Sequence, residues 1–109
     1  MPVIEQDIVN AMQPADACTA YFDADLLKMP LHIRRAETGD RMVPFGMKGW
    51  KLVSDMMTDK KLNRFQKERQ CVVQSGDDII WLVGVRSDNR FRVTEHTTRI
   101  LRLRVSASQ

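Results

Sequence analysis

The sequence is poor in cysteine and histidine, and the few it has are not close together. Its two cysteines, Cys18 and Cys71, and its two histidines, His32 and His96, are scattered along the chain. Zinc sites draw on Cys and His at short spacings, so this pattern argues against a metal site. The two cysteines could form a disulfide, but two buried free thiols in a cytosolic protein are the favoured interpretation.

Long apolar runs and nucleotide-binding glycine motifs are also missing. The longest apolar stretches, such as Ile79–Val83, have the length of a strand, whereas a transmembrane helix needs about 20 residues. Glu5 and Asp7 stand where a secretory signal would be basic and then apolar, so we expect no such signal. Gly46-Met47-Lys48-Gly49 fits neither the Walker motif nor the dinucleotide fingerprint. These absences argue against a membrane protein and a nucleotide-binding enzyme.

Proline and glycine are too scarce for a disordered linker. The 109 residues include four prolines and five glycines, and they are 43% hydrophobic and 28% charged, as in ordinary globular domains. We expect one folded domain at residues 17–109. Residues 1–16 show little pattern and are interrupted by Pro14 and Asp16, so they are expected to form an N-terminal extension or a short helix.

Charge is distributed unevenly along the chain. Residues 1–33 contain one lysine against five acids (−4), residues 34–69 contain ten Lys and Arg against five acids (+5), and residues 70–109 contain six Arg against four acids (+2). A central basic segment suits a polyanion, and nucleic acid is the favoured one at this size. A solvated surface of mixed charge is the alternative.

Alternation and turn residues predict an α+β fold with a mostly antiparallel, sandwich-like sheet and two short helices inserted in the middle. Strands are expected at residues 18–22 and 31–35, the second alternating apolar and polar residues and therefore half-buried. Residues 38–41 and 44–49 read as turns or loops.

Two helices are expected next. Leu52, Val53, Met56 and Met57 have helical spacing and form one apolar stripe. A second helix is expected from Asn63, a good N-cap with Gln66 three residues on, to about Gln70.

The last third of the chain reads as β structure. Residues 71–73 and 79–85 are expected to form a hairpin around the turn residues Ser75–Asp78. Further strands are expected at residues 91–94 and 100–105.

Basic residues near the second helix are the main functional signal. Lys60, Arg64 and Lys67 are four and three positions apart, so they would line one face of a helix that extended that far. Phe65 would then face the core. Lys61 and Arg69 flank this stripe, and the loop cations Arg41, Lys48 and Lys51 could converge on the same surface. Alternatively, these are solvated side chains that pair with Asp59 and Glu68.

The aromatic and acidic side chains give weaker indications of function. The aromatic residues Trp50, Trp81, Phe45, Phe65 and Phe91 form no evident base-stacking surface in the sequence, and Trp81 lies in a core-like strand. We therefore expect any RNA to be bound through the phosphates and 2′-hydroxyls of a duplex rather than through its bases. Asp23 and Asp25 are interpreted as a surface or turn feature, not as a catalytic acid–base pair.

An ordered series of motifs resembles one family. Arg34, Gly39-Asp40-Arg41 and Pro44-Phe45-Gly46-Met47-Lys48-Gly49-Trp50-Lys51-Leu52 are similar to the Arg…Gly-Asp-Arg…Pro-x-Gly-x-x-Gly-x-Lys-Leu segment of the C-terminal domain of tRNA(Ile)-lysidine synthetases. Residues 59–62, Lys67, 80–86 and 90–94 follow the same family in order, so the resemblance covers about residues 20–105. Cys71 and Leu62-Asn63 depart from the prolines that the family often has there, which leaves the path of residues 62–71 open.

The resemblance implies a function without catalysis in this chain. Enzymes of this family adenylate the wobble cytidine of an isoleucine tRNA with ATP, and lysine then displaces AMP. That chemistry, with its ATP and Mg, belongs to an N-terminal domain with a Ser-Gly-Gly-x-Asp-Ser loop, and this sequence contains no Gly-Gly. The resemblance implies a cytoplasmic, tRNA-binding part of a ligase. Its expected partners are the acceptor stem of tRNA(Ile) and the enzyme's own catalytic domain, with a second copy of the chain as a further candidate.

The resemblance also supplies site residues. The full set of candidate nucleic-acid-binding residues, taken from the residues and from the family pattern together, is Arg34, Arg41, Lys48, Lys51, Lys60, Lys61, Arg64, Lys67 and Arg69. The glycines Gly39, Gly46 and Gly49 would shape the backbone. Asp40 is expected to be structural, through an Asx-type turn or a pair with Arg41. A protein-interaction or dimerisation module with a basic surface remains the alternative function.

Overall fold

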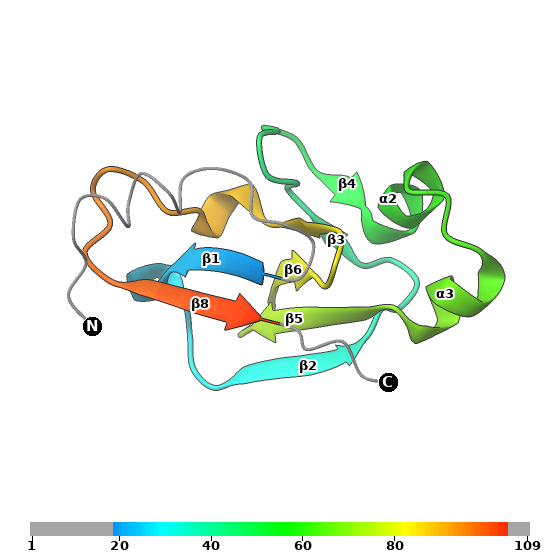
Figure 1. The fold of residues 1–109 in the computed structure, drawn as a ribbon, viewed down its shortest axis with the longest axis horizontal. Coiled ribbons are helices and arrows are strands. Elements are labelled where there is room, and N and C mark those ends of the chain that lie inside the picture. The colour runs from blue at the N-terminus through cyan, green and yellow to red at the C-terminus, as the bar shows by residue number, and fades with distance from the viewer. Residues whose placement is uncertain (1–18, 105–109) are drawn as a thin grey trace.

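The computed structural model describes residues 19–104, which form three antiparallel sheets and two short helices (Figure 1). The four-stranded sheet has the order β2 (Leu31–Arg35), β5 (Cys71–Ser75), β6 (Asp78–Leu82) and β7 (Arg86–Ser87). The two-stranded sheets pair β1 (Thr19–Asp23) with β8 (Ile100–Arg104) and β3 (Arg41–Met42) with β4 (Lys51–Leu52). The helices are α2 (Val53–Asp59) and α3 (Arg64–Arg69), and two 3-10 turns, η1 (Ala24–Leu26) and η2 (Asn89–Phe91), complete the elements. The predicted α+β class is confirmed.

The central sheet is buried on both faces, and a bulge in β6 changes which of its side chains reach each face. Val73 pairs with Trp81 and Gln74 with Ile79, so Ile80 is an extra residue on its strand. A bulge of this kind breaks the strict alternation of side chains. Accordingly, Ile79 packs in one hydrophobic cluster, while the consecutive Ile80 and Trp81 both pack in the other.

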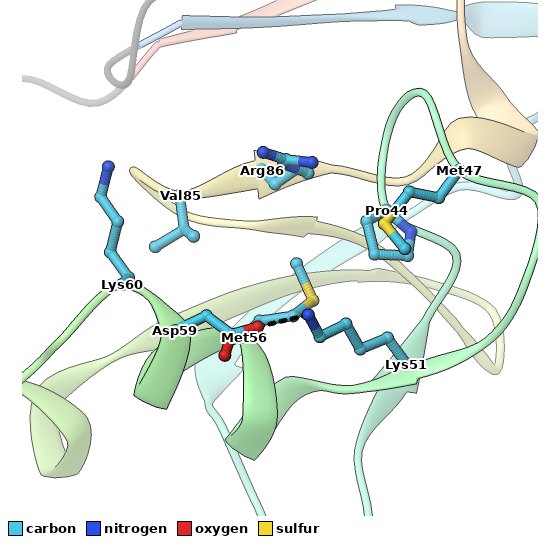
Figure 2. Close-up of a pocket in the computed structure, with 8 residues that line it drawn as sticks. All are labelled: Pro44, Met47, Lys51, Met56, Asp59, Lys60, Val85 and Arg86. Atoms are coloured by element: carbon cyan, nitrogen blue, oxygen red, sulfur yellow. Dashed lines mark hydrogen bonds and ion pairs between the residues drawn. The ribbon is translucent and has the colours of Figure 1, made fainter.

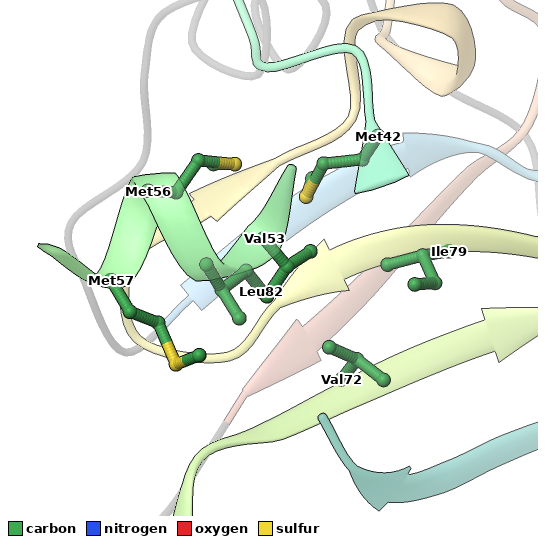
Figure 3. Close-up of a cluster of buried hydrophobic side chains, with 7 residues drawn as sticks. All are labelled: Met42, Val53, Met56, Met57, Val72, Ile79 and Leu82. Carbon is green, nitrogen blue, oxygen red and sulfur yellow. The ribbon is translucent and has the colours of Figure 1, made fainter. Parts of the chain in front are cut away.

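One cluster lies between the central sheet and α2. Figure 3 shows side chains from α2 and β3 directed toward those of β5 and β6. Its buried members are Met42, Val53, Met56, Met57, Val72, Ile79 and Leu82. Burial of this many apolar side chains, each worth about 1.5–3 kcal/mol, holds a helix of only seven residues that would not be stable alone.

The second cluster lies between the sheet and the β1–β8 pair. Phe22 and Ile80 are fully buried, and the Phe22 ring meets the Trp81 ring edge-on with centroids 6.5 Å apart. Phe91 of η2 adds to this cluster. The placement of Trp81 in the core confirms the prediction from its strand.

The positions of the two helices agree with the prediction, but the burial of some of their side chains does not. Asn63 and Gln66 form a reciprocal capping box with two 2.8 Å hydrogen bonds, so α3 begins where predicted. Leu52 is wrong as a member of the apolar stripe, because it ends β4 and is 43% exposed. Phe65 is also wrong as a core residue: it is 71% exposed, and Leu62 packs against the core instead.

Three strand predictions need correction. Residues 31–35 do form a strand, but Ile33 is 67% exposed, because β2 is an edge strand whose Arg34 makes the contacts with Gln74 and Asp40. The strand predicted at 79–85 ends at Leu82, where a turn follows. The strand predicted at 91–94 is absent, because η2 occupies its beginning.

Some predictions are only partly covered by the structure. Cys71 is a half-buried free thiol, whereas Cys18, residues 1–16 and Val105 lie outside the described residues. No helix within residues 19–104 is long and apolar enough to cross a membrane.

Candidate nucleic-acid interface

Arg34 and Asp40 fasten the turn before β3. Arg34 donates from Nη1 and Nη2 to the Asp40 carboxylate at 2.9 and 3.1 Å and from Nε to Gln74 at 2.8 Å. The Asp40 carboxylate also accepts from the Glu37 backbone N–H at 2.7 Å. The hydrogen bond to Asp40 raises the pKa of Arg34. Burial would raise the pKa of Asp40, but the hydrogen bonds from Arg34 and Glu37 outweigh it and hold that pKa below its ordinary value. Asp40 thus pairs with Arg34 rather than with the predicted Arg41.

A second buried carboxylate, Asp88, fixes Arg90. Asp88 is 0% exposed and accepts from the Val43 backbone N–H at 3.0 Å. It also accepts from the Arg90 backbone N–H at 2.8 Å and from Nε and Nη2 of Arg90, each at 3.0 Å. Nη1 of Arg90 reaches Asp78 at 3.1 Å. The hydrogen bond to Asp88 raises the pKa of Arg90. The sequence reasoning missed this network, although Asp88 two positions before Arg90 is a pattern that can cap a turn.

The loop at residues 43–50 is pinned to η2 and β7. The backbone N–H of Phe45 donates to Ser87 at 2.9 Å, and that of Gly46 donates to the Asn89 side chain at 3.1 Å. Gly46 has φ +85°, a conformation that glycine adopts without strain. The pinned loop presents Lys48 and Trp50 on the surface.

Next to this loop lies a pocket of about 190 Å³, with apolar walls and a mostly basic rim (Figure 2). Its walls include Pro44, Met47, Met56 and Val85, and its charged residues are Lys51, Asp59, Lys60 and Arg86. Lys51 pairs with Asp59, as the dashed line in Figure 2 shows. Two cations at the rim, Lys60 and Arg86, have no ion pair within residues 19–104. Arg86 was not among the predicted site residues.

The predicted continuous helical stripe of Lys60, Arg64 and Lys67 is wrong in its geometry. Lys60 caps the end of α2, Lys61 has φ +60°, and α3 begins only at Arg64. The two helices nevertheless lie together at one end of the domain (Figure 1). Nζ of Lys67 reaches the Thr58 hydroxyl of α2 at 3.1 Å, which places both helix surfaces side by side.

The nine candidate residues fall into two groups. The side chains of four are engaged within the domain: Arg34 with Asp40, Lys51 with Asp59, Arg64 with Glu68 and Lys67 with Thr58. The remaining five are exposed and have no ion pair in the part of the chain that the structure describes: Arg41, Lys48, Lys60, Lys61 and Arg69. The second group supplies the cations that are available to an external anion.

The turn at residues 75–78 does not have the geometry of a phosphate-binding loop. Residues 75–78 join two antiparallel strands as a hairpin turn, whereas a phosphate-binding loop leads from a strand into a helix. Within residues 19–104, no three His, Cys, Asp or Glu residues gather where they could hold a metal ion.

Asp23 accepts from the Thr97 hydroxyl and Asp25 from Arg99, so this pair fastens the chain ahead of β8.

Comparison with known proteins identifies relatives. The family model described as the TilS substrate C-terminal domain matches residues 31–105. The tRNA(Ile)-lysidine synthase of Bacteroides thetaiotaomicron is 49% identical over 88 residues, covering 81% of this chain and 21% of that protein. The enzyme of the same name from Parabacteroides distasonis is 51% identical over 82 residues, covering 75% of this chain and 19% of that protein. The chain therefore spans about a fifth of the length of these relatives.

Two solved structures share the fold. The crystal structure of a TILS C-terminal domain matches with a TM-score of 0.70 and 22% identity, over 85% of this chain and 75% of that one. An N-terminal fragment of the phenylalanyl-tRNA synthetase β-subunit from Pyrococcus horikoshii matches with a TM-score of 0.67 and 16% identity, over 86% of this chain and 28% of that one.

Proposed function

Because the chain belongs to the TilS substrate C-terminal domain family, we propose that it binds the sugar–phosphate backbone of tRNA(Ile) on behalf of a tRNA(Ile)-lysidine synthase. In this proposal the ligation itself, with its ATP and Mg, belongs to another part of that enzyme, which acts in the cytoplasm. The acceptor stem is the proposed region of the tRNA, and the catalytic domain is the proposed protein partner.

The observation that carries this proposal is the group of exposed, unpaired cations around α2 and the neighbouring loop. Lys60, Lys61 and Lys48 reach solvent without an acidic partner in residues 19–104, and Arg86 stands at the same pocket rim as Lys60. Lysine and arginine in this arrangement bind phosphate oxygens and release counterions, which gives affinity that depends strongly on salt. They specify position on a duplex rather than a base sequence.

The test is a binding titration with tRNA(Ile), an acceptor-stem minihelix and a DNA duplex at two salt concentrations. We expect the full chain to bind both RNAs in a salt-dependent manner. The double variant K60E/K61E should weaken this binding and reduce the slope of log K against log salt by about 2, since each lost phosphate contact removes about 1.

A matched control is available on the opposite side of the central sheet. Arg102 and Arg104 are exposed on β8, which belongs to the pair that covers the face away from α2. The double variant R102E/R104E changes the net charge by the same amount and should leave the slope nearly unchanged. Equal losses in both variants would attribute binding to net charge alone. No binding of the wild-type chain to either RNA at low salt would refute the proposed function.

A further inference from the structure

Trp50 presents an aromatic face on the surface beside two arginines. Its side chain is 54% exposed, although the chain packs its other tryptophan, Trp81, to 4% exposure. The guanidinium carbon of Arg90 lies 4.5 Å from the Trp50 ring centroid, and that of Arg41 lies 4.9 Å from it. Both distances are within the range of a cation–π contact. Both guanidinium groups lie over the half-exposed ring, so a base that stacks on Trp50 has to take the place of one of them.

The two arginines differ in how firmly they are held. Arg90 is fixed by the buried Asp88 and by Asp78, as described above. Arg41 is exposed and has no ion pair within residues 19–104. The guanidinium of Arg90 thus holds the Trp50 ring in place, while the guanidinium of Arg41 can move aside for a ligand or toward the phosphate of that ligand.

The ring borders a polar hollow of about 280 Å³. Trp50, Arg41 and Arg90 share this hollow with Gln74 and with the exposed Asp77, whose carboxylate has no ion pair among residues 19–104. Sites that enclose a whole small molecule measure about 300–1,000 Å³, so the hollow suits one base of a larger chain. The amide of Gln74 is engaged with Arg34 and with the Gly76 carbonyl, but the Asp77 carboxylate can accept a hydrogen bond from the amino group of a base edge.

We propose that this hollow receives one unpaired nucleotide of a bound RNA, with its base stacked on Trp50 and its phosphate near Arg41. The inference rests on the proposed function, because the exposed lysines would hold the adjoining duplex. A base inside a duplex is covered by its neighbours, so only a single-stranded end or bulge can offer its face to the ring. This differs from the expectation based on the sequence, in which the aromatic residues formed no stacking surface and only the backbone was bound.

Intrinsic fluorescence provides a direct readout, since Trp50 and the buried Trp81 are the only tryptophans of the chain. Three ligands share one RNA hairpin: a blunt form, a form with a short single-stranded 3′ extension, and a form whose extension has the same phosphates but abasic sugars. We expect the base-bearing extension to quench the fluorescence and to bind about 5-fold or more tightly than the abasic one. Removal of a base–aromatic stack typically weakens affinity by about 5- to 150-fold.

Three variants separate stacking from a structural role of the ring. W50L should abolish the gain from the bases while leaving affinity for the blunt and abasic forms unchanged, and W50F should restore most of that gain. F65L removes a ring from α3 that is more exposed than Trp50 and lies outside the hollow, and this variant should keep the gain. Thermal unfolding of each variant shows whether the domain is still folded.

Equal binding of the base-bearing and abasic forms by the wild-type chain, without quenching, would overturn the inference. Salt-sensitive binding of all three hairpins in that case would still support the proposed function. If free nucleoside monophosphates quenched Trp50 with the affinity of the extended hairpin, the assignment of the hollow to an RNA strand would be wrong. Loss of affinity for all three hairpins in W50L would show that Trp50 acts by shaping the loop.

Discussion

Removal of the Asp88 carboxylate should destabilise the domain more than any comparable change at an exposed acid. Asp88 is 0% exposed and accepts hydrogen bonds from two backbone N–H groups and from the Arg90 guanidinium. In D88A, the Val43 N–H loses its side-chain acceptor, and a buried donor left unpaired costs about 1–3 kcal/mol. Breaking a buried ion pair by removing one partner costs about 3–5 kcal/mol.

The lower end of that range applies, because Arg90 keeps Asp78 as a partner and its side chain is 30% exposed. We expect D88A to lower the free energy of unfolding by about 3 kcal/mol, and a small domain loses about 4–8 °C in Tm per kcal/mol. The change should therefore exceed about 12 °C in a thermal scan followed by tryptophan fluorescence. D88N retains one acceptor oxygen and should lose less.

D25A is the matched control. Asp25 also pairs with an arginine, Arg99, but its side chain is 51% exposed. Exposed pairs contribute at most about 1 kcal/mol, so this variant should unfold close to the wild-type temperature. A D88A variant that unfolds within about 1 kcal/mol of the wild type, or no more easily than D25A, would refute the argument that the Asp88 network holds the loop and η2 together.

Two further predictions concern the segment between β2 and β4. The pKa of Asp40 is held below its ordinary 3.8, so near that pH the folded state binds fewer protons than the unfolded state. The ionised Asp40 therefore adds to the free energy of unfolding above pH 3.8, and this contribution is lost as the pH falls through the pKa of the folded state. In urea titrations, D40N should therefore be less stable than the wild type at pH 6 and should lose less stability than the wild type between pH 6 and pH 3. The same dependence on pH in both proteins would contradict this. G46A should cost about 1 kcal/mol because Gly46 has φ +85°, whereas G49A, at a position without positive φ and with open space around it, should change the urea midpoint little. Equal effects of the two glycine variants would show that backbone conformation is not the cause.

Features that depend on neighbouring residues in the chain could be predicted from the sequence. The capping box of α3 is a pair of hydrogen bonds between Asn63 and Gln66, and the hairpin turn at 75–78 uses residues suited to a turn. The family pattern supplied the order of the motifs. Each of these signals is contained in a few consecutive residues, so no knowledge of the rest of the fold is needed.

Features that depend on distant contacts could not be predicted. Phe65 and Ile33 are apolar residues that no other element covers, and periodicity alone cannot show which side of a short element faces the core. The positive φ of Lys61 separates the two helices and breaks the continuous basic stripe. Arg34 was expected to be available to nucleic acid, but it pairs with Asp40, and Trp50 meets Arg90 from a segment far along the chain.

Dependence on distant contacts also limits how much of the candidate site could be predicted from the sequence. A count of lysines and arginines identifies a basic segment, but it cannot distinguish a cation held by a carboxylate from one that is free. Lys51 and Lys60 illustrate this, since both line the pocket while only Lys51 has an acidic partner there. The separation into engaged and available cations required the three-dimensional positions of the acids.

The burial of β6 on both faces also has a consequence for how the domain unfolds. Because Ile79 and Leu82 pack toward α2 while Ile80 and Trp81 pack toward the β1–β8 pair, one strand belongs to both hydrophobic clusters. Neither layer can be peeled away without exposing a face of β6 to water, so the two layers should behave as one cooperative unit rather than as separate foldons. The basic surface near α2 thereby draws its rigidity in part from the opposite side of the molecule.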